Sequence, residues 1–306
     1  MNIIEKIKLQ TRSLLHSMFS NNTPITAKLK FYEILFKMQL NKTPQSKREI
    51  FYQSVSIFKS QGRVNNLIAQ TVNEFGVTEA DLFISASLKG LIYLPQKTIH
   101  FRYAMHDICI KKHGLIPNMY KIKRIEVTIK YVLIIEKDSM FSNLISLIDK
   151  LIEEGKNILQ LNECMLVCTK GYPDLNTLRF LSTLNANNVF GLFDFDPFGI
   201  HIFLVIKNGS KKNNNLRIEK IKKIGINMED IFIYKIDEKE TLELNKWDNK
   251  KIKTMLDDKT IDKDIKNDLL FIKGYGRKLE MDIFILRDPL FMVNYLNSKL
   301  ENENIK

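Results

Sequence analysis

The sequence has 306 residues, of which 44% are hydrophobic, which is enough for one large domain or two ordinary ones. Its formal net charge of +12 indicates a polyanionic partner, either a nucleic acid or an anionic membrane surface. The three cysteines are odd in number and scattered, which excludes a disulfide framework, and no apolar run is long enough to span a membrane. We therefore expect a soluble intracellular protein with no membrane segment.

The N-terminal part of the chain predicts helices. Residues 1–24 are expected to form a helical arm, and Pro24 suits the first turn of the helix that follows. After the break at Ser60-Gln61-Gly62, an amphipathic helix ends at Gly76, which has the position of a C-terminal cap. The polar face of this helix, which carries Arg63, can contact phosphates and base edges, but it is equally compatible with a solvated surface.

A small hairpin is predicted after these helices. Residues 82–87 and 91–94 predict two strands, joined by a turn at Lys89-Gly90. Helices followed by a small hairpin are typical of a winged helix-turn-helix, which suits duplex DNA. The irregular stretch 103–120 is interpreted as the end of this domain and a linker, so the first domain is predicted over residues 25–120.

Strands and helices alternate in the second predicted domain, residues 121–306. Strand, helix, strand, helix predicts an α/β fold with a mostly parallel sheet, and ligands bind at the carboxyl ends of the strands in such sheets. Ser139 and Asp174 are placed to cap two of the helices. The predicted strands are residues 131–135, 165–168, 189–193 and 231–236.

Acidic side chains follow the first and third of these strands. Glu136 and Asp138 come directly after the first strand, and Asp194 and Asp196 come after the third. An Asp-x-Asp-Pro segment alone favours a simple turn, but both acidic groups fall at the same edge of the sheet, where oxygen ligands suit a hard cation such as Mg²⁺. Lys137, between two acids, is either a surface residue or a counter-ion of this site.

The second strand also ends in a polar segment. Thr169-Lys170-Gly171-Tyr172-Pro173-Asp174 follows this strand and opens a helix. A helix N-terminus with a lysine nearby is a ready anion site, and although a Lys-Gly turn alone is a weak signal, its place at the same sheet edge strengthens it. This edge is therefore predicted to hold a phosphate beside the cation.

A metal beside a phosphate still needs a nucleophile for group transfer. Tyr52 lies four residues after Arg48, and both project from one face if this segment is helical. A phenol needs a base, a cation or a metal to attack at neutral pH, and Arg48 can stabilise both the phosphate and the phenolate. A tyrosine in an Ile-Phe-Tyr run is more often a core residue, and spacing alone does not single out Tyr52 from the ten tyrosines.

Several separate stretches, in the right order, resemble the A subunit of type IIB DNA topoisomerase (topoisomerase VI). They are closer still to its eukaryotic meiotic relative, the transesterase that makes programmed DNA double-strand breaks, toward which Phe193 and the Asp-Phe-Asp form also lean. The resemblance runs from about residue 25 to nearly the end of the chain. The stretches that carry it are Lys47–Tyr52, Ser87–Leu91, Val132–Phe141, Thr169–Asp174 with Arg179, Gly191–Ile200, Gly209-Ser210 and Gly276–Glu280.

The resemblance implies a fold and a mechanism. A winged-helix (CAP-like) domain carries the catalytic tyrosine, and a toprim α/β domain with a C-terminal helical extension holds Mg²⁺. Tyr52, assisted by Arg48, would attack a DNA backbone phosphate and form a 5′-phosphotyrosyl link. The implied metal ligands are Glu136, Asp194 and Asp196, with Asp138 as an extra acid, and the implied DNA-binding residues are Lys89, Lys170, Arg63 and Arg179.

The resemblance also implies partners. It predicts a homodimer, or a 2:2 assembly with the B-like partner of topoisomerase VI, acting on double-stranded DNA in the nucleus with other accessory proteins of the break machinery. Two alternatives stand beside this reading: the A subunit of a topoisomerase VI that relaxes or decatenates DNA with an ATPase partner, and a non-catalytic DNA-binding protein on the same scaffold. Tyr52 and the three acids argue against the last. Phe195 stands where small residues are usual in the family, which raises the question of crowding at the metal edge.

Overall fold

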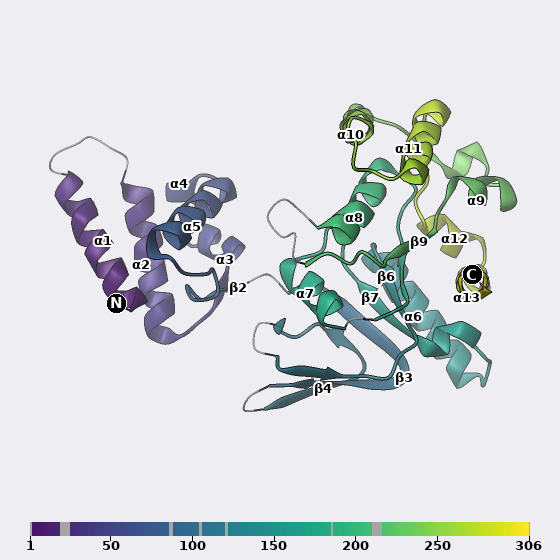
Figure 1. Ribbon diagram of the computed structural model, residues 1–306, viewed down its shortest axis with the longest axis horizontal. Helices are drawn as coiled ribbons and strands as arrows, with labels where there is room; N and C mark the ends of the chain where they lie inside the picture. The colour runs from purple at the N-terminus through teal and green to yellow at the C-terminus, as the bar shows by residue number, and fades with distance from the viewer. Residues whose placement is uncertain are drawn as a thin grey trace. The chain divides into compact units, whose positions relative to one another are not determined.

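The computed structural model describes residues 2–18, 25–85, 88–103, 106–119, 122–184, 186–209 and 216–305. It consists of two compact units, Met1–Ser87 and Leu88–Lys306, and each is considered by itself (Figure 1). No helix in these ranges is both long and apolar enough to cross a membrane.

The first unit is mainly helical. Helix α1 packs against α2, so the predicted N-terminal arm is part of the unit, and Ile7 of α1 is buried in its core. The short strands β1 and β2 pair in parallel. The elements in chain order are α1 (Ile3–Met18), α2 (Thr26–Asn41), β1 (Gln45–Ser46), α3 (Lys47–Tyr52), α4 (Val55–Phe58), α5 (Gln61–Phe75) and β2 (Ile84–Ser85).

Helix α5 is the predicted amphipathic helix. Val64, Leu67 and Ile68 form its buried stripe. The Ser60 hydroxyl accepts a hydrogen bond from the Arg63 N–H at 3.3 Å, and Gly76 ends the helix with a φ of 61°, a left-handed conformation that favours glycine. Burial of one face and caps at both ends explain why this helix could be read from the sequence.

The predicted hairpin is wrong. Residues 91–94 belong to strand β3 (Leu91–Arg102) of the second unit, where Ile92, Tyr93 and Leu94 are fully buried and Leu91 to Tyr93 pair with β7 (Cys164–Cys168). The middle of the stretch predicted to be irregular forms strand β4 (Asp107–Leu115), which pairs antiparallel with β3. A large sheet buries this apolar strand better than a two-stranded hairpin does, so the units divide at Ser87 and not at residue 120. Residues 86 and 87 of the predicted hairpin lie outside the described residues.

The second unit is built around a seven-stranded sheet in the order β4-β3-β7-β6-β8-β9, with β5 (Arg124–Glu126) pairing with β3. Strands β6 (Tyr131–Ile135), β7, β8 (Val189–Leu192) and β9 (Lys222–Gly225) run parallel. Every residue of β6, β7 and β8 is buried, as the all-apolar runs predict for a sheet covered on both faces. The α/β fold with a mostly parallel sheet is therefore confirmed.

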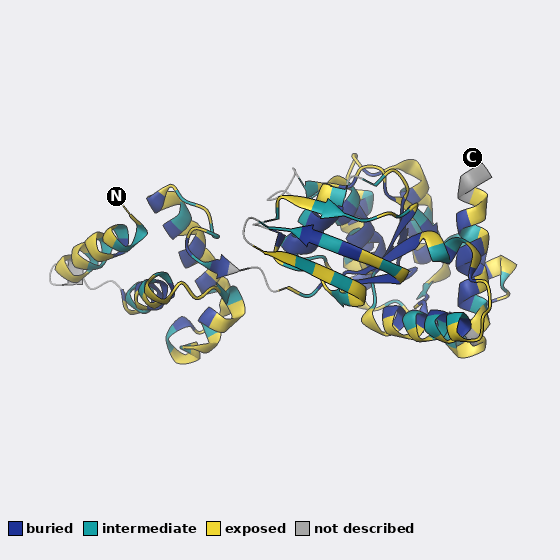
Figure 2. Ribbon diagram, turned by 90° about the horizontal axis from the view of Figure 1, so that it is seen from below, coloured by how far each residue is buried: buried dark blue, intermediate teal, exposed yellow. Residues whose placement is uncertain are grey.

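Helices cover this sheet and extend beyond it. Figure 2 shows the buried residues concentrated in the strands and exposed residues on the outer faces of the helices. The Asp174 carboxylate caps α7 by accepting the Thr177 N–H at 2.8 Å, as predicted, whereas α6 begins before Ser139. The helices are α6 (Asp138–Glu153), α7 (Leu175–Leu184), α8 (Pro197–Asn208), α9 (Met228–Ile233), α10 (Lys246–Leu256), α11 (Lys263–Tyr275), α12 (Asp282–Arg287) and α13 (Pro289–Ile305), with the short strands β10 (Leu242–Glu243) and β11 (Arg277–Lys278) between them.

The predicted fourth strand at residues 231–236 is also wrong. This segment contains the end of α9, and the fourth parallel strand is β9 instead. The Asp230 carboxylate accepts the Asn227 N–H at 2.9 Å and the Tyr295 hydroxyl at 2.8 Å. The bond from Asn227 caps the first turn of α9, and the bond from Tyr295 of α13 holds the Asp230 carboxylate in place. This segment therefore forms a helix and not the predicted strand.

Candidate active site

The carboxyl ends of β6, β7 and β8 form one edge of the sheet, called the carboxyl edge from here on. The three strands are in register, since Ile135 of β6 pairs with Cys168 of β7 and with Leu192 of β8. The residues after these strand ends therefore meet: the Asp194 N–H donates to the Glu136 carboxylate at 3.3 Å. The predicted meeting of Glu136 with the Asp194 segment is thus observed.

Two backbone hydrogen bonds fix the aspartates of this edge. Asp194 is 7% exposed, and its Oδ1 accepts the Met281 N–H at 2.8 Å. Asp196 caps α8 by accepting the Gly199 N–H at 2.5 Å. A Cβ on Gly199 would lie 2.4 Å from the Asp194 carbonyl oxygen, so only glycine allows this tight turn. The carboxylates are held before any cation binds.

Burial is the main cause that raises the pKa values of the three acids. Burial, with added repulsion from Asp194 and Asp196, raises the pKa of Glu136 to about 8. Burial also raises the pKa of Asp194 to about 6 and moves the pKa of Asp196 upward. Closely spaced, poorly solvated carboxylates of this kind favour the approach of a cation.

Lys137 is the internal cation of this edge. Its Nζ lies 3.7 Å from Asp194 Oδ2 and 2.8 Å from Glu280, and it also binds Asp282. Burial acts to lower the pKa of Lys137, but hydrogen bonds to Asp282 and Glu280 outweigh burial and raise it. Of the two readings left open by the sequence, the counter-ion is the one observed.

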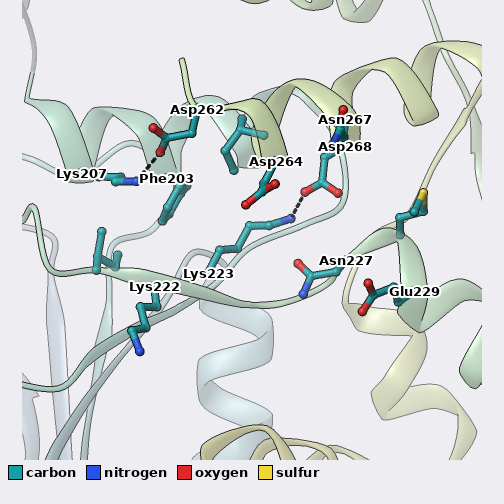
Figure 3. A pocket seen from close by; sticks show the side chains of 13 residues that line it. Phe203, Lys207, Lys222, Lys223, Asn227, Glu229, Asp262, Asp264, Asn267 and Asp268 are labelled. Carbon is teal, nitrogen blue, oxygen red and sulfur yellow. Dashed lines mark hydrogen bonds and ion pairs between the residues drawn. The ribbon is translucent and has the colours of Figure 1, made fainter. Parts of the chain in front are cut away.

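Phe195 does not crowd the acids. Its side chain is buried, with its ring centroid 6.1 Å from that of Phe271 and 5.2 Å from Lys223 Nζ. Lys223 pairs with Asp268 at 2.7 Å in a cavity of about 630 Å³ that α8, β9 and α11 line (Figure 3). The bulk of Phe195 is therefore taken up by the core, on the opposite side of the chain from the acids.

The carboxyl edge suits Mg²⁺. In the described ranges, no three Asp, Glu, His or Cys side chains close into a complete ligand cluster. Mg²⁺ does not need one, because it usually keeps several waters and binds through one or two carboxylates together with substrate phosphates. Glu136, Asp194 and Asp196 supply oxygen ligands of this type, and buried carboxylates with raised pKa values gain most from a divalent charge.

Asp138 lies with Lys170 and Lys89, two of the predicted DNA-binding residues, beside these acids. Asp138 is exposed and pairs with Lys170 at 2.9 Å, so its carboxylate is not directed at the acid cluster. The Lys89 ammonium donates to the Lys170 carbonyl at 3.1 Å, and the Lys89 N–H donates to Asp174 at 3.1 Å. Lys89 therefore belongs to the second unit and to the carboxyl edge, not to the wing of a DNA-binding domain.

Tyr52 lies on the first unit, at the end of helix α3. Reciprocal hydrogen bonds between Ser46 and Glu49 cap this helix, and the fully buried Ile50 anchors it. The Tyr52 side chain is 64% exposed, so the reading of a core tyrosine is wrong. Arg48 is exposed one turn earlier on the same helix. The structure thus presents both side chains to solvent.

The chain matches known proteins over both units. The family model of the Toprim domain shared by the A subunit of topoisomerase 6 and by Spo11 matches residues 131–300, which is more than half of the chain. A second family model, "Type IIB DNA topoisomerase", matches residues 23–84. This chain belongs to the topoisomerase 6A/Spo11 family.

Three similar proteins show the range of the family. The chain is 31% identical to a probable meiosis-specific protein SPO11 homolog of Encephalitozoon cuniculi, over 90% of this chain and 89% of that protein. It is 31% identical to the meiotic recombination protein rec12 of Schizosaccharomyces pombe, over 77% of this chain and 66% of that protein. It is 26% identical to the A subunit of DNA topoisomerase 6 from Arabidopsis thaliana, over 85% of this chain and 61% of that protein.

The segment Lys278–Asp282 of this topoisomerase 6A/Spo11 chain supports the acids, a role that the sequence alone does not indicate. Leu279 pairs with Phe195, and Glu280 and Asp282 hold Lys137. The Gly276–Glu280 stretch was part of the resemblance, but nothing in the sequence places it beside residues so far away.

A tyrosine–histidine pair beside the carboxyl edge was missed as well. The Tyr172 hydroxyl lies 2.7 Å from His201 Nδ1, and burial, followed by the charge of Lys251, lowers the pKa of His201 to about 4. Of the remaining predicted DNA-binding residues, Arg63 is half-buried on α5 and Arg179 is half-buried on α7.

Proposed function

We propose that this chain makes DNA double-strand breaks of the kind that initiate meiotic recombination, by transesterification and not by hydrolysis. The observation that carries the proposal is that one chain holds both an exposed Tyr52 on a capped helix of the first unit and a set of carboxylates fixed by hydrogen bonds on the toprim sheet of the second. The names of its relatives, which describe meiotic and meiotic recombination proteins, support the meiotic role.

In the proposed reaction, the Tyr52 oxygen attacks a backbone phosphorus and loses its proton. A bond forms between that oxygen and phosphorus, and the bond from phosphorus to the 3′ oxygen breaks, which leaves a 5′-phosphotyrosyl link and a free 3′-hydroxyl. Arg48, one helical turn away, stabilises the phosphate. No water enters the bond exchange, so the energy of the phosphodiester is retained in the link.

Glu136, Asp194 and Asp196 would hold Mg²⁺, which when bound supplies positive charge to the phosphate oxygens. Lys170 and Lys89 would contact the phosphates beside it, and Arg63 and Arg179 would contact DNA elsewhere. Asp138 would act only as a peripheral acid, because it is paired with Lys170.

The first unit would act as a DNA-binding unit of the winged-helix type. Its order of helix α2, strand β1, helices α3 to α5 and strand β2 supports the helical part of this assignment, whereas the strand predicted for the wing belongs to the sheet of the second unit. We further propose that the chain works as a homodimer or with the B-like partner of topoisomerase VI, that a second protomer completes each site, and that the complex acts in the nucleus on chromosomes with accessory proteins.

The second candidate function is that of the A subunit of topoisomerase VI, favoured by the match to the Arabidopsis protein of that name. It differs in resealing the cut DNA after strand passage with an ATPase partner. Relaxation of supercoiled DNA by the chain together with its B-type partner would support this candidate, and covalent complexes without relaxation would support break formation.

The test of the proposed function is the capture of protein on DNA 5′ ends. The wild-type chain in Mg²⁺ is expected to give covalent complexes that survive denaturation, and Tyr52→Phe is expected to give none while it still binds DNA. Tyr275→Phe is the matched control, because Tyr275 is also an exposed tyrosine but lies on α11. Covalent complexes formed by Tyr52→Phe would overturn the assignment of the nucleophile.

A further inference from the structure

An aromatic and basic surface lies on helix α10, beside the carboxyl edge. It consists of Lys246, Trp247, Lys250 and Lys251 together with Phe198 of α8, and it is called the α10 surface here. Trp247 is 61% exposed, with the ammonium groups of Lys246 and Lys250 at 5.4 Å and 6.0 Å from its ring. The Lys251 ammonium lies 5.9 Å from the ring of Phe198. The exposed rings of Trp247 and Phe198 are thus each accompanied by lysine ammonium groups.

The charge of this helix is one-sided. Its lysines at 246, 250 and 253 are exposed, whereas its one acid, Asp248, is fully buried and pairs with Lys278 at 2.9 Å. The buried side chains Ile252 and Met255 lie on the same face as Asp248. The exposed charged side chains of α10 itself are therefore all lysines, which suits a polyanion and opposes a basic protein partner.

The α10 surface is connected to the segment around Asp194 and Asp196 through α8 and Lys278. Helix α10 packs against α8 and α11 (Figure 1). Phe198 follows Asp196 by two residues, and Lys278, which holds Asp248, precedes the residue that pairs with Phe195. The α10 surface therefore adjoins the start of α8, directly after the segment that carries Asp194 and Asp196.

We propose that the α10 surface binds DNA whose bases are unpaired, as in the single-stranded overhang of a broken end, with the lysines on phosphates and Trp247 stacked on a base. Aromatic rings flanked by cations are the usual platform for single-stranded DNA, because every base has a face that can stack. Inside an intact duplex both faces of each base are covered, so an exposed indole has no base to stack on. The inference rests on the proposed function, because cutting both strands creates the ends that this surface would hold.

The chain contains one tryptophan, so its intrinsic fluorescence reports on this surface directly. The full chain, in the Tyr52→Phe form and without Mg²⁺, is titrated with an oligothymidine of about 20 nucleotides, which exceeds a typical single-strand site. Equal titrations use a blunt duplex and a duplex with a single-stranded overhang, and binding is followed independently by the anisotropy of labelled DNA. We expect strong quenching of the Trp247 fluorescence by oligothymidine and by the duplex with an overhang. At the same degree of binding, the blunt duplex should quench it only weakly.

Variants separate stacking from charge. Trp247→Ala is expected to weaken oligothymidine binding by about tenfold because it removes the stacking ring, and Trp247→Phe by less because a smaller ring remains. Phe232→Ala, which removes a similarly exposed ring on α9, is the matched control and is expected to bind like the parent protein. Lys246→Ala with Lys250→Ala is expected to lower the slope of log affinity against log salt by about 1.4, since each contact to a single strand contributes about 0.7. The exposed pair Lys235 and Lys239, changed in the same way, should leave the slope as it is.

The outcomes separate this inference from the proposed function. Oligothymidine that binds without quenching, or equal quenching by blunt duplex, would overturn the inference. A blue shift of the fluorescence that depends on protein concentration, without any response to DNA, would instead show a protein interface and also overturn it. Covalent attachment by wild-type protein is scored separately, so the proposed function can stand while this inference fails, or fail while quenching is still observed.

Discussion

The backbones of Phe195 and Leu279 exchange two hydrogen bonds, from the Phe195 N–H at 2.9 Å and from the Leu279 N–H at 3.1 Å. This bridge places the segment Lys278–Asp282 along the Asp-Phe-Asp turn. The Met281 N–H, two residues after Leu279, therefore reaches the Asp194 carboxylate. Phe195 is thus a structural residue: its backbone pairs with Leu279 and its ring packs in the core. Its side chain packs inward on Phe271 and Lys223, which leaves the aspartates on either side free to face the carboxyl edge.

Shortening the side chain of Phe195 should therefore reduce stability more than metal binding. Phe195→Ala is expected to lower the free energy of unfolding by about 3–5 kcal/mol, as for other buried phenylalanines, and Phe195→Leu by clearly less. Urea denaturation measures both. Phe232→Ala, at a ring that is 65% exposed, is the control and should cost less than about 1 kcal/mol. A Phe195→Ala protein as stable as that control would show that the ring is not part of the core.

The part of this fold that the sequence predicts is the part governed by local pattern. Strands β6 and β7 are uninterrupted apolar runs, and the acid after β6 and the lysine after β7 follow from strand direction. Strand β9 escaped prediction because it contains Lys222 and Lys223, and the second of these is acceptable in a buried strand only because Asp268 of α11 pairs with it. Such a partner is invisible to periodicity.

The same distinction applies to the site. Glu136, Asp194 and Asp196 could be placed at one edge from the sequence, because parallel strands end together. Lys137 could not be assigned, since its partners Glu280 and Asp282 are remote in sequence and reach it through a bridge of only one residue pair. Residues 91–94 were misplaced for a related reason: an apolar strand pattern does not say which sheet it will join.

Removing the internal cation should make the carboxyl edge more dependent on metal. In Lys137→Met, the carboxylates of Asp194, Glu280 and Asp282 lose their shared ammonium, so the metal-free protein is expected to lose about 1–3 kcal/mol of stability. Added Mg²⁺ should then raise the unfolding temperature by more than it does in the wild-type protein, because the uncompensated carboxylates are expected to bind it more tightly, and a ligand of the native state stabilises it by an amount that grows with the logarithm of its affinity.

Thermal unfolding with and without Mg²⁺ measures this difference. Lys150→Met is the matched control: its ammonium makes only a surface contact to Glu154 at 3.9 Å, and such pairs contribute little. The same Mg²⁺-induced rise in Lys137→Met, Lys150→Met and wild-type protein would contradict the role of Lys137 as a counter-ion of the acids.

The buried carboxylate of Asp230 should be among the most sensitive positions of the second unit. It is fully buried, with Lys299 at 2.7 Å and the Tyr295 hydroxyl at 2.8 Å. Asp230→Ala leaves this lysine and hydroxyl without their acceptor and is expected to cost about 3–5 kcal/mol in urea denaturation. The neighbouring Glu229 is exposed, and Glu229→Ala is expected to change stability by less than about 1 kcal/mol. Equal losses in the two variants would count against the buried network.

Two aspartates of the carboxyl edge should differ sharply in their effect on metal dependence. Asp194 is buried next to Glu136 and positioned by the Met281 N–H, whereas Asp138 is exposed and paired with Lys170.

Asp194→Asn keeps the shape of the side chain and its hydrogen bond to the Met281 N–H but removes the negative charge of the carboxylate. We expect it to raise the Mg²⁺ concentration needed for half-maximal covalent attachment to DNA by more than about tenfold, or to abolish attachment. Asp138→Asn should change it by less than about threefold, since it removes only a partly exposed ion pair. Titration of attachment against Mg²⁺ in both variants decides the matter: a large effect of Asp138→Asn would add this residue to the metal ligands, and an unaltered Mg²⁺ requirement in Asp194→Asn would remove Asp194 from them.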